Sequence, residues 1–136
     1  MNHADRAAAL MVMCAAGAVL AGCAAGPATP AATPTRFLDR EELASCGVLE
    51  LGQGEEIPAE SLACLEDAGE EGAELSVTRP TTEGDPVTEY YRVLPGGGWE
   101  AYIDGSQDRN GGIWWYTPCP DAQELEDLAQ CQGGAL

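Results

Sequence analysis

The sequence predicts an α+β domain in which two short N-terminal helices pack on a three- to four-stranded antiparallel meander stapled by disulfides. Apolar residues follow a helical period as far as Gly69 and alternate with period two from Ala73 onward. Helices followed by a run of strands indicate a sheet that is covered by helices on one face. Four cysteines within residues 36–136 provide the disulfides, and this length suits a single domain.

The first predicted helix covers residues 40–46. Asp39 followed by Glu42 three residues later forms a capping-box pattern. Gly47 is a suitable residue for the helix C-terminus. Residues 48–51 fit either a short strand or a loop.

The second predicted helix starts at Pro58 and ends before Gly69, since proline suits a first helical turn and glycine a helix end. Its apolar face includes Cys64 and Leu65. Strand-forming residues separated by turn residues follow, which predicts a meander. The predicted strands are 73–78, 87–94, 99–104 and 113–117. A last helix is expected over 121–130.

The disulfides are expected among Cys46, Cys64, Cys119 and Cys131, whose pairing the sequence leaves open. Cys46 and Cys64 can meet if their segments fold back on each other. A helix continuous over 121–130 would hold its ends roughly 15 Å apart, too far for a bridge between Cys119 and Cys131. That bridge therefore requires the helix to start near Leu125, and otherwise the C-terminal pair joins the N-terminal pair.

An uncharged apolar run, residues 7–22, follows Arg6 and ends at Leu20-Ala21-Gly22-Cys23. The run is short for a membrane span and suits a signal peptide. The motif at its end resembles the lipobox of bacterial lipoproteins. The rest of the chain is similar in style to the small lipoproteins of GC-rich, actinobacterial-type cells.

This resemblance implies that residues 1–22 are a signal peptide and that Cys23 carries a diacylglycerol group. It implies a protein that is anchored by this lipid to the extracytoplasmic face of the cell membrane. Residues 23–35, rich in Pro, Ala and Thr, then form a tether of roughly 30–40 Å if extended. Residues 36–136 form the domain.

The formal net charge of −17 repels nucleic acid and favours cationic partners or divalent cations. The alternative is a solvated acidic surface, as secreted proteins have. Catalysis is also disfavoured. The only histidine, His3, lies in the signal peptide, the chain has no lysine, and its cysteines are expected in disulfides. We therefore predict a protein that is not an enzyme. The remaining catalytic alternative is a small hydrolase that uses paired carboxylates.

The loop after residue 103 carries oxygen-bearing side chains at every second position, as calcium loops do. The candidate ligands are Asp104, Ser106, Asp108 and Asn110. Arg109 takes the place of the glycine in the EF-hand pattern, and Trp115 takes the place of its final glutamate. A structural calcium module is therefore an alternative, and otherwise no cofactor is expected.

Aromatic residues are concentrated in the predicted strands. Adjacent residues of a strand point to opposite faces, so some of these rings must lie on the face away from the helices. The candidate contact residues on this open face are Tyr90, Tyr102, Trp114 and Tyr116. The sequence predicts a non-catalytic binding module whose partner is an envelope protein or a glycan. Packing of these aromatics inside the domain is the alternative.

Overall fold

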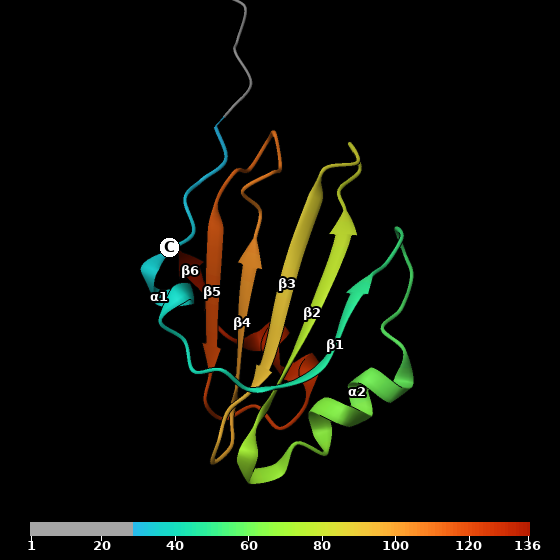
Figure 1. Cartoon of the computed structure of the whole chain (residues 1–136), viewed down its shortest axis with the longest axis vertical. Helices are drawn as coiled ribbons and strands as arrows, with labels where there is room; N and C mark the ends of the chain where they lie inside the picture. The colour runs from blue at the N-terminus through green and yellow to red at the C-terminus, as the bar shows by residue number, and fades with distance from the viewer. Residues whose placement is uncertain (1–28) are drawn as a thin grey trace, which may run out of the picture.

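The computed structural model describes residues 29–136, and these form an α+β fold around one six-stranded mixed sheet with strand order β1-β2-β3-β4-β5-β6 (Figure 1). The expected signal peptide and Cys23 lie outside the described residues. The strands are β1 (Ala44–Glu50), β2 (Ala73–Pro80), β3 (Pro86–Val93), β4 (Trp99–Asp104), β5 (Trp114–Cys119) and β6 (Gly134–Ala135). The helices are α1 (Thr35–Leu38), α2 (Ala59–Glu66) and the 3-10 helices η1 (Gly69–Glu71) and η2 (Leu125–Gln130).

The predicted meander is confirmed for β2 to β5, which pair antiparallel in sequence order. The predicted limit of three to four antiparallel strands is wrong, because β1 adds a parallel strand beside β2 and β6 adds a short antiparallel one beside β5. Helix α2 connects β1 to β2, which is the helical crossover that a parallel pair requires.

The predicted helix over 40–46 is wrong. The helix present in this region is α1, and Asp39 is its C-terminal cap rather than the start of a helix. The side chain of Arg40 bonds to Glu74 on β2, and residues from Ala44 onward pair with β2. Gly47, expected to end a helix, adopts a φ of +129° within β1. Pairing with a distant strand thus outweighs the local capping pattern.

Helix α2 confirms the second predicted helix, with Pro58 as its N-cap. Ser61 and Leu65 face the sheet and are buried. A disulfide joins Cys64 of α2 to Cys46 of β1, with 5.6 Å between their Cα atoms. The crossover is therefore held to the edge strand by a covalent bond.

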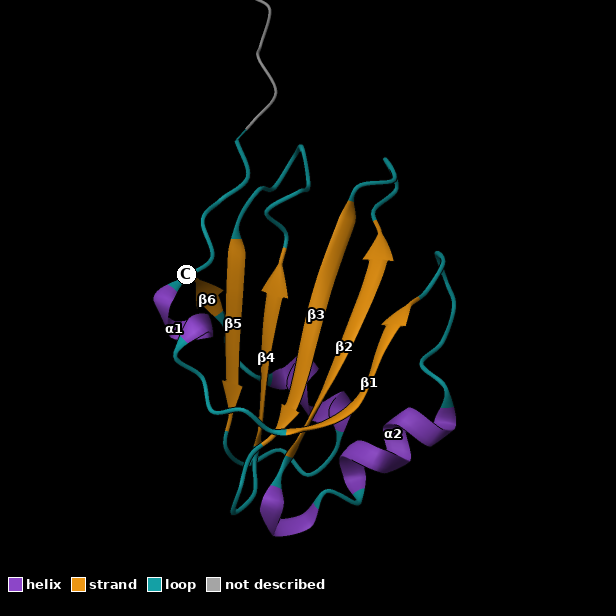
Figure 2. Ribbon diagram, in the orientation of Figure 1, coloured by secondary structure: helices purple, strands orange, loops and turns teal. Residues whose placement is uncertain are grey.

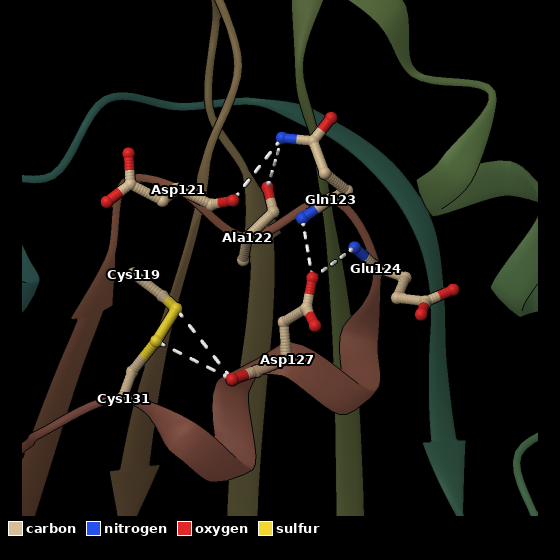
Figure 3. Close-up of a disulfide and its surroundings, with 7 residues drawn as sticks. All are labelled: Cys119, Asp121, Ala122, Gln123, Glu124, Asp127 and Cys131. Carbon is tan, nitrogen blue, oxygen red and sulfur yellow. Dashed lines mark hydrogen bonds between the residues drawn. A yellow bond between two sulfur atoms is a disulfide. The ribbon is translucent and has the colours of Figure 1, made fainter.

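The second disulfide joins Cys119 at the end of β5 to Cys131, with Cα atoms 5.7 Å apart (Figure 3). The helix expected over 121–130 is shorter than predicted and starts at Leu125, as this local bridge requires. A carboxylate oxygen of Asp127 accepts hydrogen bonds from the backbone amides of Gln123 and Glu124, which fixes the turn before η2.

The two faces of the sheet have separate cores. One face packs against α2 and η2. In the core between them, Leu65 of α2 and Leu75 and Val77 of β2 are fully buried. The other face is crossed by the segment that leads from α1 to β1, which runs on the side opposite η2 (Figure 2). A smaller core forms on this face, where Phe37 of α1 packs against Tyr102 and Trp114 of the sheet.

The C-terminal residues contact β5 closely at Gly133. A Cβ atom at this position would lie 2.3 Å from Thr117 Oγ1 and 2.3 Å from Trp115 Nε1, whereas a Cβ at Gly134 would meet nothing within 4 Å. We predict that Gly133→Ala destabilises the domain by about 1–3 kcal/mol through overpacking. The melting temperature should fall by roughly 4–8 °C per kcal/mol. Gly134→Ala is the matched control, and equal melting temperatures for the two variants would contradict this account.

Candidate functional site

The four aromatic residues predicted to form a contact surface do lie on one face of the sheet. Tyr90, Tyr102 and Tyr116 stand opposite one another across β3, β4 and β5. Trp114 lies two residues before Tyr116 and shares its face because strand residues alternate. We call these four residues the aromatic face.

The prediction that this face is open is wrong, because residues 35–43, which we call the strap, lie across it. The Phe37 ring centroid lies 4.7 Å from that of Tyr90, 5.3 Å from that of Tyr102 and 4.6 Å from that of Trp114. Tyr102 and Trp114 are each only 3% exposed. Tyr90 and Tyr116, at the two sides, are half-buried.

Arginines on both sides of Phe37 extend the contact. The Arg36 guanidinium lies 4.1 Å from the centroid of the Tyr116 ring. The Arg40 guanidinium lies 3.6 Å from the centroid of the Phe37 ring and forms a two-pronged ion pair with Glu74, at 3.0 and 3.1 Å. Such cation–π contacts are attractive, and most strongly so where the groups are desolvated.

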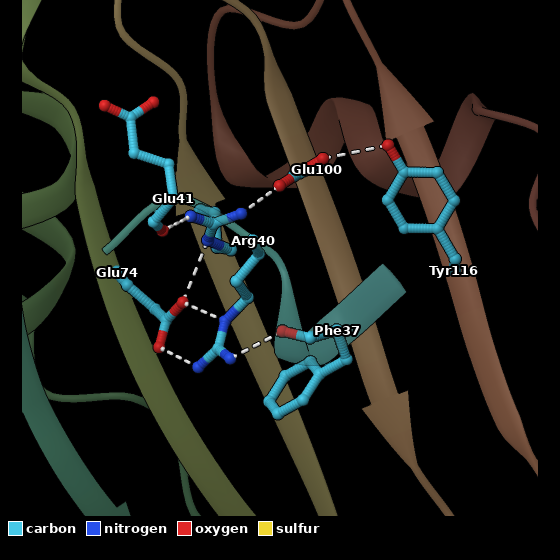
Figure 4. A network of polar contacts seen from close by, with 7 residues as sticks. Phe37, Arg40, Glu41, Glu74, Glu100 and Tyr116 are labelled. Atoms are coloured by element: carbon cyan, nitrogen blue, oxygen red, sulfur yellow. Dashed lines mark hydrogen bonds and ion pairs between the residues drawn. The ribbon is translucent and has the colours of Figure 1, made fainter. Parts of the chain in front are cut away.

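A buried ion-pair network lies beneath the end of the strap (Figure 4). Arg92 of β3 is 2% exposed, pairs with Glu100, and places its Nε 2.8 Å from an oxygen of Glu74. The same guanidinium donates to the backbone carbonyl of Glu41 in the strap. Glu100 also accepts a 2.8 Å hydrogen bond from the Tyr116 hydroxyl. The network thus joins the strap to four strands, β2, β3, β4 and β5.

The strap is held to the sheet by side chains. Its backbone hydrogen bonds are local, such as Leu38 N to the Pro34 carbonyl and Asp39 N to the Thr35 carbonyl. Within residues 29–136, none of its backbone amides pairs with a strand backbone. Leu38 is 65% exposed, so Phe37 is the main apolar anchor. The strap is therefore bound much as a short peptide would be.

A hollow of about 430 Å³ lies beside the strap, between Leu38, Leu43 and the starts of β1 and β2. Glu41 and Glu42 line it together with Ser45, Arg40 and Glu74. Glu74 already contacts two arginines, so its charge is neutralised. Glu74, which is half-buried, and Glu100, which is buried, both pair with Arg92.

Sequence reasoning missed the strap residues Arg36, Phe37 and Arg40. It assigned the chain up to residue 35 to a tether and began a helix at residue 40. The available signal was Phe37, the only phenylalanine of the chain, which lies between two of its six arginines.

The candidate calcium loop is closed by its own hydrogen bonds. Asp104 accepts from the Ser106 amide at 2.9 Å, and Asp108 accepts from the Asn110 amide at 2.8 Å. Arg109 pairs with Asp85 of the β2–β3 loop and lowers the pKa of that carboxyl to about 2. Within residues 29–136, no three His, Cys, Asp or Glu side chains are grouped so that they could hold a metal ion. The geometry is that of hydrogen-bonded turns.

No family model, curated protein or solved structure matches the chain significantly. Among residues 29–136, no helix has both the length and the apolar character needed to cross a bilayer.

Burial raises the pKa of Tyr90, Tyr91, Tyr102 and Tyr116, all four tyrosines of the protein. A hydrogen bond to Glu89 further raises the pKa of Tyr91, and one to Glu100 raises that of Tyr116. Because the folded state favours neutral tyrosines, their contribution to stability is complete below the unfolded pKa of about 10 and is lost as the pH rises further.

We therefore predict that the folded protein shows little tyrosinate absorbance at pH values slightly above 10. Tyrosinate should form together with loss of near-ultraviolet circular dichroism at higher pH. Tyr116→Phe should leave one hydroxyl fewer to titrate, without changing this coupling for the other three. Titration of any of these three near its ordinary pKa, in a protein that remains folded, would contradict the observed burial.

Proposed function

We propose that this protein is a membrane-anchored extracytoplasmic lipoprotein whose domain is a non-catalytic binding module. Its partner is an envelope protein or a glycan. The observation that carries the proposal is the aromatic face, where side chains of three strands meet and hold Phe37 of the strap. Clustered aromatic rings beside arginines are the composition typical of binding hot spots.

The distribution of charge supports binding rather than catalysis. Residues 29–136 contain no histidine or lysine, so imidazole and amine chemistry have no group to use. The carboxylates Glu74 and Glu100 stabilise Arg92 instead of facing each other across an open cleft. A retaining or inverting hydrolase would need two carboxylates that both reach a substrate.

The lipid anchor is supported by the motif Leu20-Ala21-Gly22-Cys23 and by the apolar run before it. Two acyl chains bind a membrane stably, whereas one binds only marginally. A diacylglycerol group on Cys23 is therefore sufficient without a basic surface patch. This arrangement suits a domain whose net charge repels anionic headgroups.

We predict that Cys23→Ser releases the protein from the membrane fraction of its host and abolishes incorporation of labelled fatty acid. Cys14→Ser is the matched control, since this cysteine lies within the apolar run of the signal peptide and should leave anchoring unchanged. Retention of the Cys23→Ser protein in membranes as an uncleaved precursor would refute the lipoprotein assignment.

The contact surface is tested by a photocrosslinking amino acid placed at Tyr116 of the membrane-anchored protein. We expect a specific crosslinked species with an envelope protein or cell-wall glycan. The control position is Glu60, which is exposed on α2, outside the aromatic face. The same species from both positions, or none from Tyr116, would remove the aromatic face as the contact surface.

A further inference from the structure

The strap occupies the aromatic face in the manner of a peptide ligand. One ring, Phe37, enters between three aromatic side chains, and Arg36 and Arg40 flank it with cation–π contacts and an ion pair. Peptides bind to grooves of other proteins through similar anchor residues. One buried side chain supplies most of the affinity, and charged neighbours supply specificity.

The main core contains no residue of the strap. The larger core lies on the opposite face, between the sheet, α2 and η2. The disulfides Cys46–Cys64 and Cys119–Cys131 both lie outside the strap. Departure of the strap would therefore expose the aromatic face while the sheet and its main core remain folded.

One group on the aromatic face is left unsatisfied by the strap. The indole nitrogen of Trp114 is buried and has no hydrogen-bond partner within residues 29–136, although the Phe37 ring centroid is only 4.6 Å from that of Trp114. A buried donor without an acceptor is unfavourable. A segment that reproduced the strap would leave this nitrogen equally unpaired, so the ligand is defined by the contacts of Arg36, Phe37 and Arg40.

We propose that the aromatic face accepts, in exchange for the strap, a peptide segment of another protein that carries an aromatic residue between two arginines. The chain's own Arg36-Phe37-Leu38-Asp39-Arg40 is the template for this Arg-Phe-x-x-Arg pattern. The inference rests on the proposed function, and it names the class of partner and the site that binds it.

Charge complementarity supports this choice of partner. Glu74 supplies the carboxylate that Arg40 engages, and Tyr116 supplies the ring that Arg36 covers. Any arginine-flanked segment that replaced the strap would meet the same two groups. The net charge of −17 attracts such a cationic segment and repels acidic ones.

The strap competes with a separate peptide because it is covalently linked to the site. A short linker gives an effective concentration of the order of millimolar. The apparent affinity for an added peptide is reduced by the fraction of molecules in which the strap has left. Weakening the strap should therefore increase the apparent affinity, which is the opposite of what the loss of a structural contact alone would cause.

The test uses a fluorescein-labelled peptide with the sequence of residues 34–40, which contains both arginines and only one acidic residue, Asp39. The oxidised protein is used in three forms: wild type, Phe37→Ala and Leu38→Ala. Fluorescence anisotropy measures the dissociation constant. We expect Phe37→Ala to bind the peptide at least about tenfold more tightly than wild type, since its own strap lacks the anchor. Leu38→Ala, a neighbouring and exposed position, should match wild type. A peptide with alanine in place of phenylalanine should not bind.

Near-ultraviolet circular dichroism establishes that Phe37→Ala is folded. If it is not, the double variant Arg36→Ala, Arg40→Ala takes its place, because it loosens the strap and retains Phe37. Failure of a folded loosened variant to bind the peptide overturns the proposal, and so does equal binding of the peptide without phenylalanine. Exchange of straps between two copies, seen as a dimer of the wild-type protein, also overturns it in favour of self-association.

The result of the peptide-binding test can be distinguished from the results of the tests of the proposed function. Membrane release by Cys23→Ser and crosslinking from Tyr116 do not depend on the peptide. Positive results there, combined with no peptide binding, would refute this choice of ligand alone.

Discussion

The structure of this face depends on the buried guanidinium of Arg92. It lies between Glu74 of β2 and Glu100 of β4 and donates to the Glu41 carbonyl of the strap, so one side chain connects the sheet with the segment across it. Removing one partner of a buried ion pair costs about 3–5 kcal/mol, because the remaining charge is uncompensated. Release of the strap would leave both ion pairs of Arg92 in place, but it would break the ion pair of Arg40 with Glu74 and the hydrogen bond to the Glu41 carbonyl.

The division into two cores follows from the alternation of side chains along the strands. In β2, Ala73, Leu75 and Val77 face α2, whereas Glu74 faces the strap. In β3, Tyr90 and Arg92 face the strap, and Tyr91 and Val93 contact the main core. A face that mixes aromatic and charged side chains cannot pack against an ordinary apolar helix. It is covered instead by a segment that combines one phenylalanine with two arginines, which matches its composition.

The sequence was informative wherever the signal was local. Alternating residues predicted β2 to β5 and their faces, and a proline and a glycine bracketed α2. The prediction failed where structure depends on distant partners: β1 is a strand because Ala44–Glu50 pairs with β2, against a local capping pattern. The same holds for the site. The register that gathers Tyr90, Tyr102 and Tyr116 is readable from alternation, but the position of Phe37 over them is a tertiary contact that no spacing rule encodes.

The placement of the cations supports the aromatic face as the proposed binding surface of the described domain. Each arginine within residues 29–136 is already engaged: Arg79 with Glu89, Arg109 with Asp85, Arg40 and Arg92 with Glu74, and Arg36 with the Tyr116 ring. Within residues 29–136, the other acidic side chains therefore form no ion pair. Over most of the domain surface a cationic partner gains only exposed ion pairs, which contribute little and are screened by salt. At the aromatic face the same cation also meets desolvated rings and Glu74. This contrast supports the proposed selectivity for an arginine-flanked aromatic segment.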